Sequence, residues 1–293
     1  MAHSGGPTQI FDSRLLRVRL QRAAREAGEN FLLPGLTADL IERLGMVRRD
    51  FSNVMDIASP ADIRPQIGQL LPDARLRRIA AILPTPPDEC DEIVQEERLP
   101  DFPEPFDLAV SLLAFHLVND LPGLLVQIHR ALKPDGLLIA AMLGGQTLRE
   151  LRNAFTVAES EITGGASPHV APFPDVRDMG ALLQRAGFAL PVADSETLTV
   201  RYSEPMGLLR DLRLMGGTNI LTERLRKPMR RAVLGRAMEV YRRDFSDSDG
   251  RVRATFEIIW LSGWRPHESQ QKPLKPGSAR TRLADVLPTK AYD

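Results

Sequence analysis

Hydrophobic and polar positions follow two different periods along this chain. Near its start, Leu16 and Leu20 recur at helical spacing, which predicts a helix over residues 15–27. A second helix is expected to begin at Thr37, whose hydroxyl suits an N-cap position. From about residue 50 to 145, short apolar runs alternate with amphipathic stretches. Such alternation is typical of a parallel sheet with helices on both faces.

The same pattern divides the chain into an α/β core with helical additions. The expected strands are 53–57, 78–83, 92–95, 106–113, 137–143, 196–202 and 254–264. The expected helices among and after them are 63–71, 120–132, 178–186, 205–215 and 222–245. The expected segments are an N-terminal helical cap (1–50), a Rossmann-like core (51–203), a helical insertion (204–250), the last core strand (251–270) and a polar tail (271–293). The predicted fold class is therefore α/β, with a helical insertion before the last strand.

Composition limits the partners and the cellular compartment that are expected for this protein. The 293 residues include 38 basic and 38 acidic side chains, so no net charge favours nucleic acid. The single cysteine, Cys90, excludes an intrachain disulfide and a cysteine zinc cluster. No apolar run approaches the roughly 20 residues of a membrane-spanning helix, and the first nine residues lack an apolar signal core. We expect a cytoplasmic protein with no nucleic-acid partner and no membrane span.

Several segments, in order, carry a family pattern. Residues 106–122 resemble the fourth strand and following helix start of class I S-adenosylmethionine (SAM) methyltransferases, and residues 132–137 resemble the turn before the fifth strand. Further motifs are similar to one branch of that family, the respiratory complex I assembly proteins that hydroxylate an arginine on a complex I subunit. More distantly they resemble the O-methyltransferases of malonyl-carrier thioesters. These motifs are Phe11-Asp12 and residues 144–152, 167–173, 185–188 and 263–270.

The resemblance covers about residues 10–275 and has several implications. It implies a seven-stranded SAM-methyltransferase sheet with S-adenosyl-L-methionine as cofactor. It also implies a protein partner, either a respiratory complex I subunit or an acyl-carrier-type protein. Fold resemblance does not by itself determine the reaction.

The cofactor site implied by the resemblance follows the first strand. The family pattern is an acid followed by glycines, roughly D-x-G-x-G-x-G; here Asp56 is kept, while Ala58, Pro60 and Asp62 stand at the glycine positions. Ala58 adds a methyl, Pro60 deletes an N–H donor, and Asp62 would repel the methionine carboxylate. The acid expected to bind the ribose, near Ile82, is also missing. These replacements predict weak SAM binding at this corner.

Candidate site residues also follow the third and fourth strands. Glu96 or Glu97 is expected near the adenine, with a solvated loop as the alternative, and Phe115 is expected either to stack on the adenine or to pack in the core. His116 and Asn119 follow the fourth strand at its carboxyl end, where ligands bind in open α/β sheets. His116 could be a general base or orient a substrate; the alternative is that it only ends the strand.

The remaining candidates are weaker. His169 lies in a loop that could cover the cleft, and the basic run over 224–236 is either a solvated helix face or a docking patch for an acidic protein. No metal site is expected, because the i,i+4 spacing of a helical ligand pair is missing. Two functions stay open: an enzyme of the SAM-methyltransferase superfamily acting on a protein side chain or carrier-bound acyl group, and a non-catalytic assembly factor or chaperone that keeps the fold.

Overall fold

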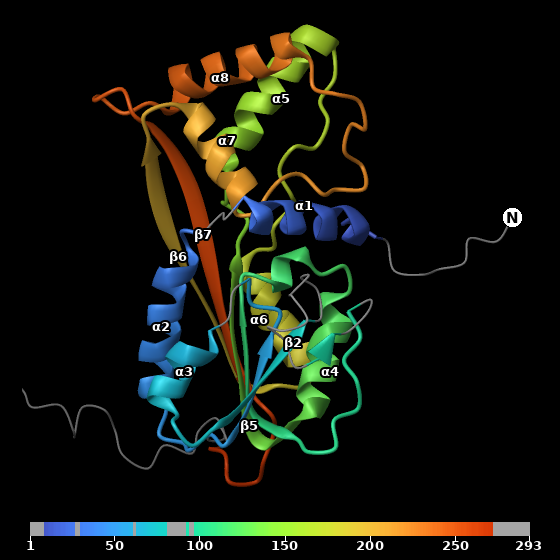
Figure 1. Cartoon of the computed structure of the whole chain (residues 1–293), viewed down its shortest axis with the longest axis vertical. Coiled ribbons are helices and arrows are strands. Elements are labelled where there is room, and N and C mark those ends of the chain that lie inside the picture. Colours follow the sequence, from blue (N-terminus) through green and yellow to red (C-terminus); the bar gives the residue numbers. More distant parts are fainter. Residues whose placement is uncertain (1–8, 27–29, 61–62, 81–91, 94–96, 272–293) are drawn as a thin grey trace, which may run out of the picture.

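One mixed sheet organises the molecule (Figure 1). The computed structural model describes residues 9–26, 30–60, 63–80, 92–93 and 97–271. Within them the sheet has seven strands in the order β3-β2-β1-β4-β5-β7-β6. The strands are β1 (Asn53–Ile57), β2 (Arg75–Ala80), β3 (Glu92–Ile93), β4 (Phe106–Leu112), β5 (Leu132–Leu143), β6 (Ala189–Tyr202) and β7 (Val252–Trp264). Strands β1 to β5 pair in parallel, while β7 is antiparallel to β5 and β6. The predicted Rossmann-like α/β class is confirmed.

Helices cover both faces of the sheet and its upper edge. They are α1 (Ser13–Arg25), α2 (Leu33–Gly45), α3 (Arg64–Leu70), α4 (Leu121–Ala131), α5 (Arg149–Thr163), α6 (Val176–Arg185), α7 (Pro205–Leu214) and α8 (Arg231–Phe245), with a 3₁₀ turn, η1 (Phe115–Leu117). Figure 1 shows α2 and α3 on one side of the sheet and α4 and α6 on the other. It also shows α1 lying across the sheet's upper end, with α5, α7 and α8 above it.

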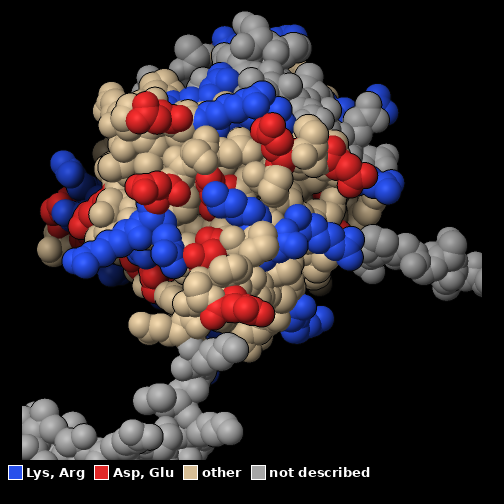
Figure 2. Space-filling model, turned by 90° about the horizontal axis from the view of Figure 1, so that it is seen from below, with Lys and Arg blue, Asp and Glu red and all other residues tan. Residues whose placement is uncertain are grey.

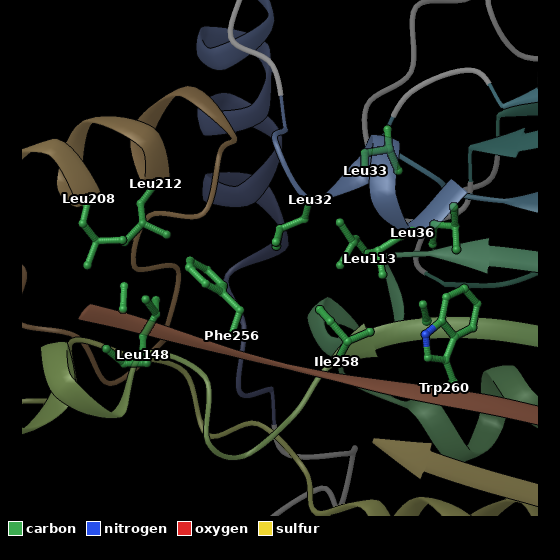
Figure 3. Packing of buried hydrophobic residues seen from close by; sticks show 14 of the residues in the cluster. Leu32, Leu33, Leu36, Leu113, Leu148, Leu208, Leu212, Phe256, Ile258 and Trp260 are labelled. Carbon is green, nitrogen blue, oxygen red and sulfur yellow. The ribbon is translucent and has the colours of Figure 1, made fainter. Parts of the chain in front are cut away.

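Strand β7 is buried on both faces because successive side chains point into two different cores. Phe256, Ile258 and Trp260 pack in one cluster with leucines of α2 and α7, which Figure 3 shows gathered along the strand. Ile259 and Leu261 pack in the second cluster, with apolar residues of α4 and α6. The strand therefore joins the two hydrophobic cores of the molecule.

The antiparallel pair β6–β7 continues beyond the rest of the sheet. Its register runs from Ala189 opposite Trp264 to Tyr202 opposite Val252, whereas β5 pairs with β7 only from residue 258 onward. The projecting part holds the upper helices: Glu150 of α5 accepts hydrogen bonds from the backbone N–H and hydroxyl of Thr255. Tyr241 of α8 donates to the backbone oxygen of Arg253 at 2.8 Å. The β6–β7 pair thus carries a helical layer above the carboxyl ends of the parallel strands.

Several boundaries correct the sequence-based expectations. Thr37 is not an N-cap, because α2 begins at Leu33 and the Thr37 hydroxyl donates to the Leu33 backbone oxygen inside the helix (2.8 Å). Residues 222–230 are turns and irregular chain, and helix α8 starts only at Arg231, since Pro228 cannot continue a helix. Strands β2, β5 and β6 begin earlier than expected, at residues 75, 132 and 189.

One expected cap is confirmed. Asp120 caps α4 by accepting a hydrogen bond from the backbone N–H of Gly123 at 2.9 Å. Its side chain satisfies one of the donors that a helix leaves free at its first turn.

The lower face of the molecule, at the amino ends of the parallel strands, is mixed in charge. Figure 2 shows basic and acidic side chains interspersed over it. At this end Asp107, in β4, accepts hydrogen bonds from the backbone N–H groups of Ser52 and Asn53 (2.8 and 2.9 Å) and lies 3.1 Å from the ammonium of Lys133. Burial alone would raise the pKa of Asp107, but these hydrogen bonds outweigh it and hold the pKa below its ordinary value.

Asp107→Asn is therefore expected to lower the free energy of unfolding at pH 7 by about 2 kcal/mol. A carboxyl group whose pKa is depressed by folding stabilises the protein above its unfolded pKa, and that contribution is lost as the pH falls through the folded pKa. The difference between wild type and variant should therefore shrink toward pH 3. Urea denaturation at both pH values measures it; an equal difference at both would contradict the assignment.

Candidate functional site

A cavity of about 640 Å³ lies between the sheet and the upper helices. Pro60, Leu113 and Leu143 place it at the carboxyl ends of β1, β4 and β5. Helices α1 and α7 and residues 216–221 close its other sides. This is the edge where open α/β sheets bind ligands, and its size is that of a ligand pocket.

The corner after β1 is closed by a buried polar network. The Asp56 carboxylate accepts a 2.5 Å hydrogen bond from the Ser59 hydroxyl and lies 3.6 Å from Nε of Arg78. Arg78, in β2, also donates to the backbone oxygen of Ser59 at 2.9 Å. All three side chains are buried. Ala58, at the first glycine position of the family pattern, has φ of +56°, a conformation that costs a non-glycine residue about 1 kcal/mol or more.

This corner does not fit SAM in its described part. Asp56, kept from the family pattern, has its carboxylate 1% exposed and faces Arg78 rather than the cavity. Ala58 and Ser59 are fully buried, and of the predicted glycine-loop residues only Pro60 lines the cavity. Arg78 from β2 thus lies beside the Asp56 carboxylate and separates it from the cavity lining. Asp62 and the Ile82 position lie outside the described residues.

The other predicted cofactor residues are engaged within the protein. Glu97 accepts hydrogen bonds from the backbone N–H groups of Asn119 and Asp120, at 2.8 and 2.9 Å. Phe115 is 1% exposed and packs in the second core cluster, away from the cavity. Glu96 lies outside the described residues. The cofactor roles assigned to these side chains stay predictions.

Of the two predicted catalytic residues, only His116 reaches the cavity. Its Nδ1 lies 3.5 Å from the backbone nitrogen of Leu143, and its ring meets the edge of Phe173. The ring is enclosed by protein yet borders the cavity, and this burial lowers its pKa to about 3. His116 is therefore a neutral imidazole at physiological pH, able to hydrogen-bond a ligand but carrying no charge.

Asn119 holds the N-terminal segment in place. Its amide oxygen accepts from the Phe11 backbone N–H at 2.8 Å, and its amide nitrogen donates to the Phe11 backbone oxygen at 3.2 Å. Phe11 also forms an antiparallel bridge with Leu221. Asn119 therefore positions α1 over the cavity rather than facing its interior, and its catalytic role stays a prediction.

The motif over 144–152 forms one wall of the cavity. Thr147 exchanges hydrogen bonds with the backbone of Glu257 in β7, and Leu148 takes a left-handed conformation (φ +55°). At Gly144 a Cβ would come within 2.7 Å of the Glu257 carboxylate, so a larger residue would displace that side chain. This packing turns Leu148 and Leu151 toward the cavity.

The motif over 167–173 forms the neighbouring wall. Glu159 of α5 accepts from the backbone N–H and hydroxyl of Ser167 and lies 2.9 Å from Nε2 of His169. The His169 ring stacks on Phe155 at 4.3 Å. Although burial alone would raise the pKa of Glu159, hydrogen bonds from Ser167 and His169 lower it.

This cluster is not a Ser-His-acid triad. Nε2 of His169 faces both Ser167 and Glu159, and the serine bonds directly to the carboxylate. A triad instead needs the acid on one ring nitrogen and the serine on the other. The cluster fixes the His169 ring in the cavity wall. Sequence reasoning missed Glu159, whose helical position carried no motif signal.

Two further properties concern the described part of the chain alone. It contains no group of three or more His, Cys, Asp or Glu side chains arranged to hold a metal ion. None of its helices combines the length and apolarity needed to cross a bilayer.

The sheet order and the cavity at the carboxyl strand ends define a Rossmann-like protein of the methyltransferase class. Residues 54–191 match the family model of a methyltransferase domain. The arginine-hydroxylase NDUFAF5 of Rattus norvegicus is 37% identical over 94% of this chain and 83% of its own length. The Danio rerio protein of that name is 44% identical over 68% of this chain and 62% of its own length. The chain therefore belongs to the class I methyltransferase family, with the NDUFAF5 arginine-hydroxylases among its relatives.

More distant relatives agree with this assignment. The malonyl-[acyl-carrier protein] O-methyltransferase of Halorhodospira halophila is 30% identical over 94% of this chain and 95% of its own length. The crystal structure of the YcgJ protein from Bacillus subtilis superposes with a TM-score of 0.50 at 12% identity, covering 80% of this chain and 99% of that one. The structural likeness concerns the fold alone.

Replacing Arg78 by Met is expected to destabilise the fold by about 3 kcal/mol, because it removes the cation beside a buried carboxylate. Urea denaturation at neutral pH measures the loss. Combining it with Asp56→Asn should recover part of the stability, since the uncompensated charge is then gone. Arg75→Met, on the same strand but exposed, is the control and should change stability by less than about 0.5 kcal/mol. Equal effects of the Arg75 and Arg78 variants would contradict a buried pair.

Proposed function

We propose that this chain acts on or with a protein partner in the assembly of respiratory complex I, and that it does so without binding SAM at the corner after β1. The observation that carries the proposal is the contrast between two neighbouring regions. The cofactor corner is filled by Arg78 and its bonds to Asp56 and Ser59. The adjoining cavity has a volume of about 640 Å³ and is open to a ligand.

The family motifs support a retained function in the cavity. Leu148 and Leu151, from one motif, and His169 and Phe173, from another, line it side by side. Gly144 and Glu159 serve to orient these wall segments. The similarity to the arginine-hydroxylases named NDUFAF5 covers 94% of the chain, including these walls.

The alternatives follow from the same relatives. The malonyl-carrier O-methyltransferases favour an acyl-carrier-type partner and methyl transfer from SAM. A cytoplasmic location stays a prediction for this chain, while the rat relative is named as mitochondrial.

Titration with SAM distinguishes methyl transfer from the proposed function. Isothermal calorimetry on the folded full chain should detect no binding up to millimolar SAM, because each hydrogen bond that the altered corner cannot make weakens binding by roughly 1 kcal/mol. Circular dichroism confirms that the protein used is folded. Micromolar affinity would overturn this part of the proposal and favour the methyltransferase alternative.

A cavity-filling variant tests the role in assembly. Gly217 lines the cavity, and a Cβ there would make only ordinary contacts, the nearest at 3.5 Å. Gly217→Trp should therefore place an indole at the cavity wall and occupy part of the cavity without backbone strain at that position. In cells whose only copy carries this change, assembled complex I should fall several-fold on native gels.

Gly165→Trp is the matched control, because a Cβ at Gly165 meets nothing within 4 Å and the residue does not line the cavity. Complex I should stay at its wild-type level in cells with this variant. A normal level of assembled complex I in cells lacking the protein would contradict the proposed role in complex I assembly.

A further inference from the structure

The charged side chains that line the cavity all have the same sign. They are Arg19 of α1 and Arg210 and Arg213 of α7, and no Asp or Glu is among the described lining residues. His116 contributes no charge because burial keeps it neutral. A guanidinium entering this cavity would meet three cations and no carboxylate, which is unfavourable on simple Coulomb grounds. An anionic ligand would instead be attracted by the three cations.

The positive charge continues outside the cavity along a basic belt, defined here as α1 together with residues 224–231. Helix α1 contains five arginines and no acid, and residues 224–231 contain five further basic side chains. The two segments are joined by the Phe11–Leu221 bridge and by a 2.8 Å hydrogen bond from the Asp12 N–H to the Ile220 backbone oxygen. The N-terminal end of α1 therefore lies against the segment that leads into residues 224–231, and both parts of the belt contribute to the cavity lining.

Carboxylates neutralise little of the belt's charge in the part of the chain that the structure describes. Within the described residues, its only ion pair joins Arg224 to Asp12 at 3.1 Å. Arg19 donates a hydrogen bond to the backbone oxygen of Asn219, and its pKa is lowered by burial and then by the neighbouring Arg224 and Arg22.

The contrast with α8 is direct. There Arg236, Arg242 and Arg243 face carboxylates at 2.6, 3.9 and 2.6 Å. Arginines over residues 236–243 of α8 thus face carboxylates, whereas the belt, which includes Arg231 at the start of α8, has a single ion pair among the described residues.

Apolar side chains are exposed in the same place. Val18, Leu225 and Met229 of the belt are exposed, as is Met206 of α7, and both methionines line the cavity. Methionine adapts its shape to varied apolar partners. Exposed apolar groups among unpaired cations suit a ligand that is both apolar and acidic. Because the cations extend well beyond the cavity, the ligand is extended too.

We propose that the cavity and the basic belt form one docking site for an acidic–apolar segment of a protein, with an apolar side chain in the cavity and carboxylates on the belt. The proposal rests on the proposed function and gives the partner's chemistry. The docking segment and the residue that is modified are then different parts of the partner. The docking segment is anionic even if the modified residue is an arginine.

Fluorescence anisotropy with short labelled peptides tests the site on the full chain. A peptide alternating Glu with Leu and Phe should bind at micromolar concentration and weaken as salt rises. A peptide with the same Glu residues but Ser for the apolar ones should bind at least tenfold more weakly, and a Lys-for-Glu peptide should not bind. Failure of the first peptide to bind below millimolar concentration would overturn the proposal.

Charge-reversal variants locate the site. Arg226→Glu with Arg230→Glu, and separately Arg210→Glu with Arg213→Glu, should each weaken the acidic–apolar peptide at least tenfold. Arg242→Glu with Arg243→Glu, on α8, keeps the same charge change away from the belt and should leave binding within twofold. Equal losses in all three would contradict a defined site. Gly217→Trp should also abolish binding, whereas Gly165→Trp should not.

Other anionic partners are outcomes of the same assay. Tighter binding of vesicles containing phosphatidylglycerol, or of an RNA oligonucleotide, would overturn the assignment to a protein segment. The result is separable from the proposed function: loss of complex I in cells without the protein, combined with no peptide binding, overturns only the docking site. Peptide binding with normal complex I overturns only the proposed partner.

Discussion

The antiparallel strand β7 is the element on which the rest of the architecture depends. Its alternating side chains fill both cores, so neither face of the sheet is complete without it. Its projecting half carries α5 and α8 through Glu150–Thr255 and Tyr241–Arg253 hydrogen bonds. The cavity exists because this helical layer is held above the strand ends rather than packed onto them. The position of the upper layer and the shape of the cavity are thus consequences of one strand's length.

The corner after β1 combines a buried ion pair with a backbone that carries few glycines. Ala58 and Pro60 give this turn less backbone freedom than glycines would. Arg78 then supplies a cation to the acid at the strand end, and the pair is buried. Removing either partner of such a buried pair lowers the stability of the fold strongly, because the other charge is left buried without a counter-ion. The same strand order therefore supports a closed corner and an open cavity side by side.

Much of the fold could be predicted from the sequence, and the reasons for the failures are local. Apolar runs located β1, β4, β5 and β7 because most residues of these strands are buried, and Asp120 was recognisable as a cap by residue type alone. Thr37 was misplaced because a hydroxyl can bond within a helix as well as cap it. The length of β6 was missed since its early part is partly exposed and its strand conformation comes from pairing with β7. His116 borders the cavity because its position follows from strand order, and its catalytic role stays a prediction. Sequence reasoning could not assign Asn119, whose amide bonds to Phe11, because that contact joins residues far apart in the chain.

Net charge was the least informative part of the sequence, for a physical reason. A sum of zero is compatible with any arrangement of charges, and only the distances between them decide the local field. On α8 and beside the projecting end of the β6–β7 pair, arginines lie within 3.9 Å of carboxylates, so their fields largely cancel. On α1 the helix has no acid of its own to offset five arginines. Surface ion pairs add little stability, so keeping arginines unpaired there costs the fold little. It leaves positive potential beside an apolar cavity, where the low dielectric of the protein strengthens its action on a ligand.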